Sequence, residues 1–351
     1  MYDSSELIDD FHDAHVNLTL ALRQDMHSRR DANLARLEAG LKELEKPAIV
    51  ENINQGGNAM QTMTQQPEAD TETRYDIDVG VVFDASETLT PATTKEWVRA
   101  AIAKKATNLK NEPDAKKKCV RVVYADGYQC DFPVFKREKT YDKYKYSIAI
   151  GTEWTESNPK AINDWFEAVV KEKSPEEESG FQLRRIARFV KYFCKVKAHH
   201  GRAKFPAGLV ATALAVEAYV PVKDRDDQSF YETLKYLSSR SELSPVFANG
   251  TQISGEKEKD RIKRLKEAAA DAVEILKPLF EGKEEVSEAD AKKAWKKVFR
   301  HSFFNADEVK KNETVAAAAI LSVSPEDKIR RAQAEAARLS SSGVQTKPWA
   351  R

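Results

Sequence analysis

Apolar residues recur at three- and four-residue steps from about residue 5 to residue 45, beginning with Leu7, Phe11 and Leu18. This period is that of an amphipathic helix, and Pro47 follows its end. The pattern therefore predicts one long helix or two. The next segment, 52–73, is polar, contains Gly56-Gly57, and has little periodicity. We expect it to be a loop with at most one helical turn.

Four later segments are rich in Val, Ile, Tyr and Phe, which is typical of strands. They cover residues 75–83, 120–124, 129–135 and 144–150. Asp126-Gly127, between the second and third of them, predicts a tight hairpin turn. Helical spacing over 91–109 separates the first two strands. Residues from about 48 to 155 are therefore expected to form a small mixed sheet with helices.

Beyond Asn158 the pattern is helical, with apolar stripes separated by Pro, Gly or acidic runs. The expected helices lie near 160–172, 181–198, 206–219, 228–239, 258–282 and 287–299. From Ser324 the chain is charged and rich in Ala, which predicts a last helix and a disordered tail. We therefore divide the chain into an N-terminal helical brace (1–47), a core (48–157), a C-terminal helical domain (158–325), and a helix end with a tail (326–351).

Composition adds the class of protein. With 41% hydrophobic and 32% charged residues the chain is expected to be soluble and globular. Its 57 Lys and Arg nearly cancel its 56 Asp and Glu, so net charge gives no strong case for nucleic-acid or membrane-surface binding. The most apolar stretch, 208–222, is interrupted by Glu217 and falls short of the roughly 20 residues of a membrane helix.

Cysteine usage and the first residues bear on the compartment. Cys119, Cys130 and Cys194 are an odd set without CxxC spacing, which predicts reduced thiols. The first residues lack the charged and apolar regions of a secretory signal. Both features predict a cytoplasmic protein.

Three carboxylates are the first candidate chemistry. Side chains alternate along a strand, so Asp76 and Asp78 share one face while Ile77 and Val79 share the buried one. Neighbouring carboxylates repel each other, and Mg²⁺ relieves the repulsion through the oxygen ligands that it prefers. With Asp131 on a second β-rich segment, three acids could hold two ions about 3.5–4 Å apart. The alternative is that the first two acids face solvent on an edge strand and the third caps a turn.

Gly56-Gly57 is the second candidate feature. Glycine lets the backbone approach a ligand closely, and successive N–H groups there can cradle phosphate oxygens. Asn58 and Thr62 would add neutral donors. The alternative is a plain turn between a helix and a strand. The chain contains neither GxxxxGK[ST] nor GxGxxG, so P-loop and Rossmann phosphate sites are excluded.

A basic stripe is the third candidate feature. Arg184, Arg188, Lys191 and Lys195 are spaced by four, three and four residues, so they lie along one side of a helix. Facing the carboxylates, this stripe could hold a triphosphate, with Lys191 as a point charge. The alternative is a solvated basic face.

These motifs together resemble a known family. The Gly-Gly pair, the strand Asp-x-Asp and the third Asp resemble the DNA polymerase β-like nucleotidyltransferase superfamily. The 18-residue gap between Gly57 and Asp76 is similar to that of the bacterial cGAS/DncV-like nucleotidyltransferases, the cyclic-oligonucleotide synthases of anti-phage signalling. The stretches 55–62, 154–166 and 183–191 also resemble that family. Two departures are Gly57 and Gly208, which stand where relatives carry phosphate-contacting serines.

The resemblance implies an α+β fold: a polymerase β-like core braced by an N-terminal helix and a C-terminal helical domain. It implies synthesis of a cyclic di- or trinucleotide from nucleoside triphosphates, with pyrophosphate released. Mg²⁺, or Mn²⁺ in its place, would bind as two ions at Asp76, Asp78 and Asp131, and Asp131 would help the acceptor hydroxyl lose its proton. The nucleotide-binding residues implied are Gln55, Gly56, Gly57, Asn58, Thr62, Lys191 and Gly208.

The expected ligands are ATP, GTP or pyrimidine nucleoside triphosphates, and a regulatory protein partner is compatible with the sequence. Two other functions stay open. One is a related enzyme that makes linear oligonucleotides or transfers a nucleotide to a protein. The other is a nucleotide-binding regulator without catalysis, which the glycines at positions 57 and 208 would favour.

Overall fold

The computed structural model describes residues 1–68, 70, 75–107, 109–176, 180–206, 208–240, 256–282 and 285–305. Residues 1–301 form one compact unit. Residues 302–351 form a second unit, in which a short 3-10 turn, η3 (Ser302–Phe304), is described. The tail predicted for 326–351 lies outside the described residues, and the boundaries predicted at 47 and 157 remain predictions.

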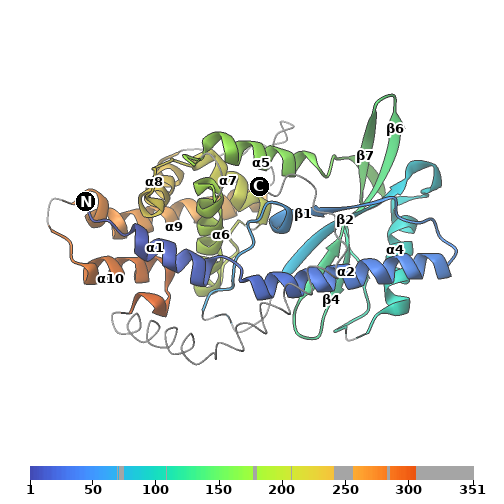
Figure 1. Ribbon diagram of the computed structural model, residues 1–351, viewed down its shortest axis with the longest axis horizontal. Coiled ribbons are helices and arrows are strands. Elements are labelled where there is room, and N and C mark those ends of the chain that lie inside the picture. Colours follow the sequence, from blue (N-terminus) through green and yellow to red (C-terminus); the bar gives the residue numbers. More distant parts are fainter. Residues whose placement is uncertain are drawn as a thin grey trace, which may run out of the picture. The chain divides into compact units, whose positions relative to one another are not determined.

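The N-terminal segment folds as two helices, α1 (Ser5–Phe11) and α2 (Leu20–Glu43), joined by a π-helical stretch, His12–Val16. The hydroxyl of Thr19 caps α2 by accepting a hydrogen bond from the backbone N–H of Leu22 at 3.3 Å. Figure 1 shows α2 running along the sheet. At Gly40 a Cβ would collide with the backbone of Ala101 in α4 (Pro91–Lys105), so glycine lets the two helices cross closely.

One eight-stranded sheet forms the core. Its strands are β1 (Glu51–Gln55), β2 (Asp76–Asp84), β3 (Asp114–Ala115), β4 (Val120–Val123), β5 (Gln129–Phe132), β6 (Val134–Thr140), β7 (Lys143–Ile150) and β8 (Glu153–Glu156). β2 pairs antiparallel with β1 and parallel with β5 and β6. The register against β2 continues without a slip from β5 into β6, so the two are one path interrupted at Pro133, which has no N–H to donate. β4 flanks β5, and β7 flanks β6.

The strand prediction was incomplete at the polar segment after residue 50. That segment contains β1 and a helical turn, α3 (Gly56–Ala59), where a loop with at most one turn was expected. β1 escaped prediction because its sequence, Glu-Asn-Ile-Asn-Gln, buries only Ile53 and shows little hydrophobic alternation. The short strands β3 and β8 were not predicted either.

The two faces of β2 differ as the alternation predicts. Ile77 and Val79 belong to a buried cluster with residues of α2 and α4. Val82 faces the other way and packs with Ile53. Asp76 and Asp78 lie on this second face, because they are separated from Val82 by even steps along the strand. The helix α2 therefore covers the face of β2 opposite the carboxylates.

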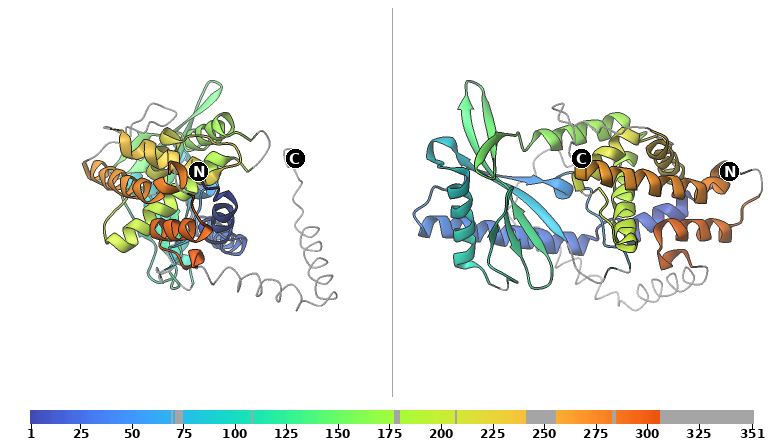
Figure 2. Two further views of the ribbon diagram at one scale, coloured as in Figure 1. Left: turned by 90° about the vertical axis from the view of Figure 1, so that its left-hand side faces the viewer. Right: turned by 180° about the vertical axis from the view of Figure 1, so that it is seen from behind.

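The C-terminal half of the first unit is helical, as predicted. Its helices are α5 (Ala161–Lys173), α6 (Gln182–Gly201), α7 (Gly208–Ala218), α8 (Asp226–Ser239), α9 (Glu256–Phe280) and α10 (Glu288–Phe299). α6 contacts α5, α7, α8 and α10, and Figure 2 shows it among the other helices next to the sheet. None of the described helices combines the length and the apolar character needed to cross a membrane.

Candidate active site

The three aspartates meet at the beginning of β2. Asp78 is the register partner of Asp131 on the parallel strand β5, and Asp76 lies on the same face two residues earlier. The pKa of the Asp78 carboxyl is raised to about 7, first by burial and then by the negative charges of Asp76 and Asp131. The sheet therefore brings together three carboxylates that are close enough to influence one another.

Asp131 is already engaged by a residue that the sequence did not single out. Arg121 lies directly opposite it on the antiparallel strand β4. The Nε and Nη2 of Arg121 donate to the two carboxylate oxygens of Asp131 at 2.8 and 2.7 Å. Asp131 is 7% exposed. Among the residues that the structure describes, no three His, Cys, Asp or Glu side chains are grouped so as to hold a metal ion.

The donor set nevertheless fits a divalent cation of the Mg²⁺ type. Within the described chain, the carboxylates of Asp76 and Asp78 accept no hydrogen bond and form no ion pair. They are hard oxygen ligands, which such cations prefer. Asp131, beside Asp78 on β5, is a third carboxylate and is paired with Arg121. The raised pKa of Asp78 indicates that no protein cation fully compensates this cluster.

Gly56 places the backbone against the carboxylates. Its φ is +60°, and a Cβ at this position would collide with Oδ2 of Asp78. Both facts require glycine, since other residues rarely adopt this φ and none would fit the space. Gln55, just before it, is the register partner of Asp78 on β1. The glycine turn thus lies directly beside the carboxylate cluster.

Lys191 approaches the same turn from α6. Its Nζ lies 3.1 Å from the position that a Cβ at Gly57 would occupy. It donates to the backbone oxygen of Thr62 at 2.5 Å and to the Thr62 hydroxyl at 3.1 Å. The pKa of Lys191 is lowered to about 7, first by burial and then by the neighbouring charge of Lys195, while the charges of Asp76 and Asp78 act in the opposite direction.

Two more cations of α6 hold the loop after the glycine turn. Arg188 donates to the backbone oxygen of Gln61 at 2.7 and 2.9 Å. Lys195 donates to the backbone oxygens of Thr64 and Gln65 at 3.0 and 3.1 Å. Arg184, the first member of the stripe, instead pairs with Glu167 at 2.6 Å. In the described chain neither Lys191 nor Arg188 nor Lys195 has a carboxylate ion-pair partner, so the cluster carries uncompensated positive charge.

The remaining predicted nucleotide ligands occupy different places. Thr62 is buried and its hydroxyl is already bonded to Lys191. Gly208 begins α7 with φ +50°, and no atom lies within 4 Å of the position of its missing Cβ. The side-chain oxygen of Asn58 accepts a hydrogen bond from Nε2 of His27 on α2 at 2.7 Å. Contacts of these residues with nucleotide remain predictions.

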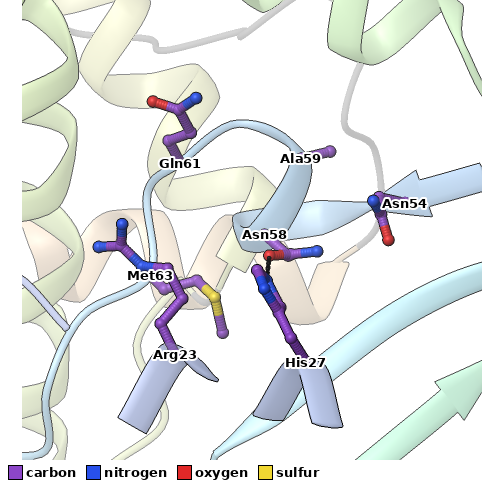
Figure 3. Close-up of a pocket in the computed structure, with 7 residues that line it drawn as sticks. All are labelled: Arg23, His27, Asn54, Asn58, Ala59, Gln61 and Met63. Carbon is purple, nitrogen blue, oxygen red and sulfur yellow. Dashed lines mark hydrogen bonds between the residues drawn. The ribbon is translucent and has the colours of Figure 1, made fainter. Parts of the chain in front are cut away.

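A pocket of about 400 Å³ lies around Asn58. Figure 3 shows His27 reaching from α2 to Asn58, with Arg23 of the same helix and with Asn54, Ala59, Gln61 and Met63 around the pocket. Asn54 is the register partner of Val79, so this pocket is on the α2 side of the sheet. The residues that line it do not include Asp76, Asp78 or Asp131.

Part of the chain is similar in sequence to known proteins. Residues 50–135 match the family described as "Cyclic GMP-AMP synthase DncV-like, nucleotidyltransferase domain". The match includes the glycine turn and all three aspartates. The cyclic GMP-AMP synthase of Escherichia albertii is 28% identical over 182 residues, which are 50% of this chain and 39% of that protein. The chain thus spans about two-fifths of the curated relative that it matches.

Solved structures resemble a larger part of the chain. DncV of Vibrio cholerae with bound GTP is 15% identical, covers 82% of this chain and 94% of its own, and gives a TM-score of 0.62. CdnC of E. coli MS115-1 with ATP is 15% identical, with 85% and 98% covered and a TM-score of 0.62. The same CdnC in complex with HORMA-deltaN is 17% identical, with 85% and 98% covered and a TM-score of 0.61. At these identities the likeness shows a shared fold, an α+β core with a helical half.

Proposed function

We propose that the chain is a bacterial cGAS/DncV-like nucleotidyltransferase. On this premise it condenses nucleoside triphosphates into a cyclic di- or trinucleotide and releases pyrophosphate. One observation carries the proposal. Three carboxylates, a glycine turn and a buried lysine from another part of the chain converge at the beginning of β2. Nucleotidyl transfer needs groups of both signs at one place, because a hydroxyl oxygen bonds the α-phosphorus of a highly charged triphosphate while the bond to the leaving pyrophosphate breaks.

The donor triphosphate would lie between the glycine turn and α6. Backbone N–H groups at Gly56 and Gly57 would cradle phosphate oxygens. Lys191 would neutralise the triphosphate, since it is a buried cation that has no carboxylate partner in the described chain and whose Nζ faces Gly57. Burial disfavours the protonated amine of Lys191, and the negative charge of a bound triphosphate would favour it. ATP and GTP are the proposed substrates, because the relatives of this fold include ones solved with each.

Asp76 and Asp78 would hold Mg²⁺, with Mn²⁺ as a substitute, and Asp131 would complete a site for two ions. The bound ions would lower the pKa of the attacking hydroxyl and offset charge on the leaving pyrophosphate. Asp131, opposite Asp78, would orient the acceptor hydroxyl and help it lose its proton. Gly56 would keep Asp78 in place by filling the space beside its carboxylate with backbone alone.

Asparagine substitutions test this assignment, because they keep the size of the side chain and remove its charge. Asp76→Asn and Asp131→Asn should each abolish pyrophosphate release from nucleoside triphosphates with Mg²⁺ or Mn²⁺. Asp84→Asn is a matched control at the far end of the same strand, where Asp84 caps a short turn through Ser86. The proposal is wrong if Asp131→Asn turns over at the wild-type rate while circular dichroism shows the same fold.

The biological setting is proposed from relatives. The CdnC structure with HORMA-deltaN motivates a regulatory protein partner, and the family resemblance motivates a role in anti-phage signalling. An enzyme that needs its partner would bind triphosphate and release no pyrophosphate alone. Adding lysate from cells that express the neighbouring genes should then restore release to the wild-type chain and leave Asp76→Asn inactive. If the wild-type chain stays silent in every such mixture, the regulator without catalysis is favoured.

A further inference from the structure

We propose that Arg121 is a latch on the active site: it holds Asp131 out of the metal site until a divalent cation takes that carboxylate from it. The inference rests on the proposed function, because it treats Asp131 as a metal ligand. It goes further by giving a role to Arg121. In this role Arg121 is a positioning residue, since it acts through Asp131.

The pairing is specific in its geometry. Arg121 and Asp131 are direct register partners on adjacent antiparallel strands, so both backbones fix the distance between them. The two hydrogen bonds of 2.8 and 2.7 Å run in parallel from one guanidinium to both carboxylate oxygens. Asp131 therefore presents both oxygens to a protein cation, although Asp78 lies beside it on the next strand.

The pair also explains the uneven charge of the cluster. Asp131 is neutralised by Arg121, whereas Asp76 and Asp78 have no ion-pair partner in the described part of the chain. Arg121 lies opposite Asp131 on β4, on the side of β5 away from β2. Two cations at one carboxylate repel each other strongly when the surroundings are partly buried. The ion held by Asp76 and Asp78 can thus bind first, and a full three-carboxylate site requires the guanidinium to leave.

The exposure of the two side chains differs in the direction that a latch needs. The side chain of Asp131 is 10% exposed, whereas that of Arg121 is 39% exposed. The carboxylate is therefore fixed in the sheet, and the guanidinium has a path to solvent. Among the described residues Asp131 is the one ion-pair partner of Arg121.

A latch has a measurable consequence for the metal. Opening the pair costs free energy, so the metal affinity of the nucleotide-free protein should be lower than the carboxylates alone would give. Arg121→Gln removes the competing charge and keeps a side chain of polar character. It should therefore strengthen metal binding through Asp131. A gain that came only from the loss of one positive charge near the cluster would persist when Asp131 is replaced by Asn.

The test measures Mn²⁺ binding to the full, nucleotide-free chain. The electron paramagnetic resonance signal of free Mn²⁺ reports how much of the ion remains unbound. Arg121→Gln should bind Mn²⁺ about tenfold more tightly than the wild type, or bind one more ion, on the scale of a broken charge-assisted pair. The double variant Arg121→Gln/Asp131→Asn should lose that gain. Arg99→Gln, which breaks another bidentate pair with Glu96 on α4, is the matched control and should bind as the wild type does.

Unchanged or weaker Mn²⁺ binding in a folded Arg121→Gln protein would overturn the latch. If Arg121→Gln does not fold, Arg121→Lys takes its place, because lysine cannot form the bidentate pair, and a smaller gain of about threefold is expected. No gain in Arg121→Lys overturns the latch equally. Asp76→Asn separates this result from the proposed function: it should weaken Mn²⁺ binding whether or not Arg121 is a latch.

Discussion

The backbone at Gly56 lies so close to the carboxylate of Asp78 that no side chain fits between them. The positive φ and the collision of a Cβ with Oδ2 of Asp78 are independent reasons for glycine. A non-glycine residue at this φ costs about 1 kcal/mol or more, and the displaced carboxylate adds to that cost. Gly57 differs, since the nearest atom to its missing Cβ is the flexible end of Lys191 at 3.1 Å.

Gly56→Ala should therefore lower the rate of pyrophosphate release by about 100-fold or more, because Asp78 is moved out of line with Asp131. Gly57→Ala is the matched control. It should reduce the rate much less, since the lysine end can shift by a few tenths of an ångström. The rate is measured by coupled pyrophosphate detection at saturating triphosphate. Equal rates in the two variants would show that the close approach to Asp78 does not matter.

The lowered pKa of Lys191 predicts that the protein takes up protons when it binds a triphosphate. Its pKa of about 7 leaves the amine mostly neutral at pH 8, and a bound triphosphate favours the charged form. Triphosphate binding at pH 8 should take up protons, and affinity should fall as pH rises from 7 to 9. Calorimetry without metal, in two buffers of different ionisation enthalpy, measures the uptake. Lys191→Met should reduce it, and wild-type binding heats that do not depend on the buffer would contradict the assignment.

At the scale of elements, α6 holds the loop that follows the glycine turn. Arg188, Lys191 and Lys195, spaced along the helix, donate to the backbone oxygens of residues 61, 62, 64 and 65. Backbone acceptors in a loop have no ladder partner, and hydrogen bonds from charged donors are worth about 1.5–3 kcal/mol each. The same side chains of α6 thus hold the loop and place basic groups beside the carboxylates.

Lys195→Met should release the far end of this loop. We expect faster hydrogen exchange at residues 64–65 and a loss of about 1–2 kcal/mol in the free energy of unfolding. Lys197→Met is the control on the same helix, because Lys197 lies over the Phe193 ring and is described with no bond to the loop. Hydrogen exchange followed by mass spectrometry compares the two. Equal exchange in both variants at residues 64–65 would mean that Lys195 does not hold the loop.

The sequence predicted the long periodic elements and the face of β2, because alternation and helical period are local signals. It did not predict the Arg121–Asp131 pair, because the length of one turn decides which residues lie opposite each other. A two-residue turn at Asp126-Gly127 would place Arg121 opposite Phe132. The observed turn closes between Tyr124 and Tyr128, with Gly127 at φ +93°, and shifts the register by one residue. A change of one residue in a turn decides that cross-strand partner.

At the scale of the first unit, residues distant in sequence converge on one end of β2. β1 brings the glycine turn, β5 brings Asp131, and α6 brings Lys191 from more than a hundred residues further on. Residue spacing predicted that such groups exist but carried no information on how α6 faces the sheet, since that depends on packing among all the helices. The candidate site is therefore a property of the whole unit.

Mass spectrometry of the reaction product tests this account most directly. The purified chain is incubated with all four ribonucleoside triphosphates and Mg²⁺ or Mn²⁺, treated with phosphatase, and compared with Asp76→Asn and with the Asp84→Asn control. We predict a phosphatase-resistant species with the mass of a cyclic di- or trinucleotide, present with the wild type and Asp84→Asn and absent with Asp76→Asn. A phosphatase-resistant product formed equally by Asp76→Asn, or linear oligonucleotides alone from the wild type, would contradict the account.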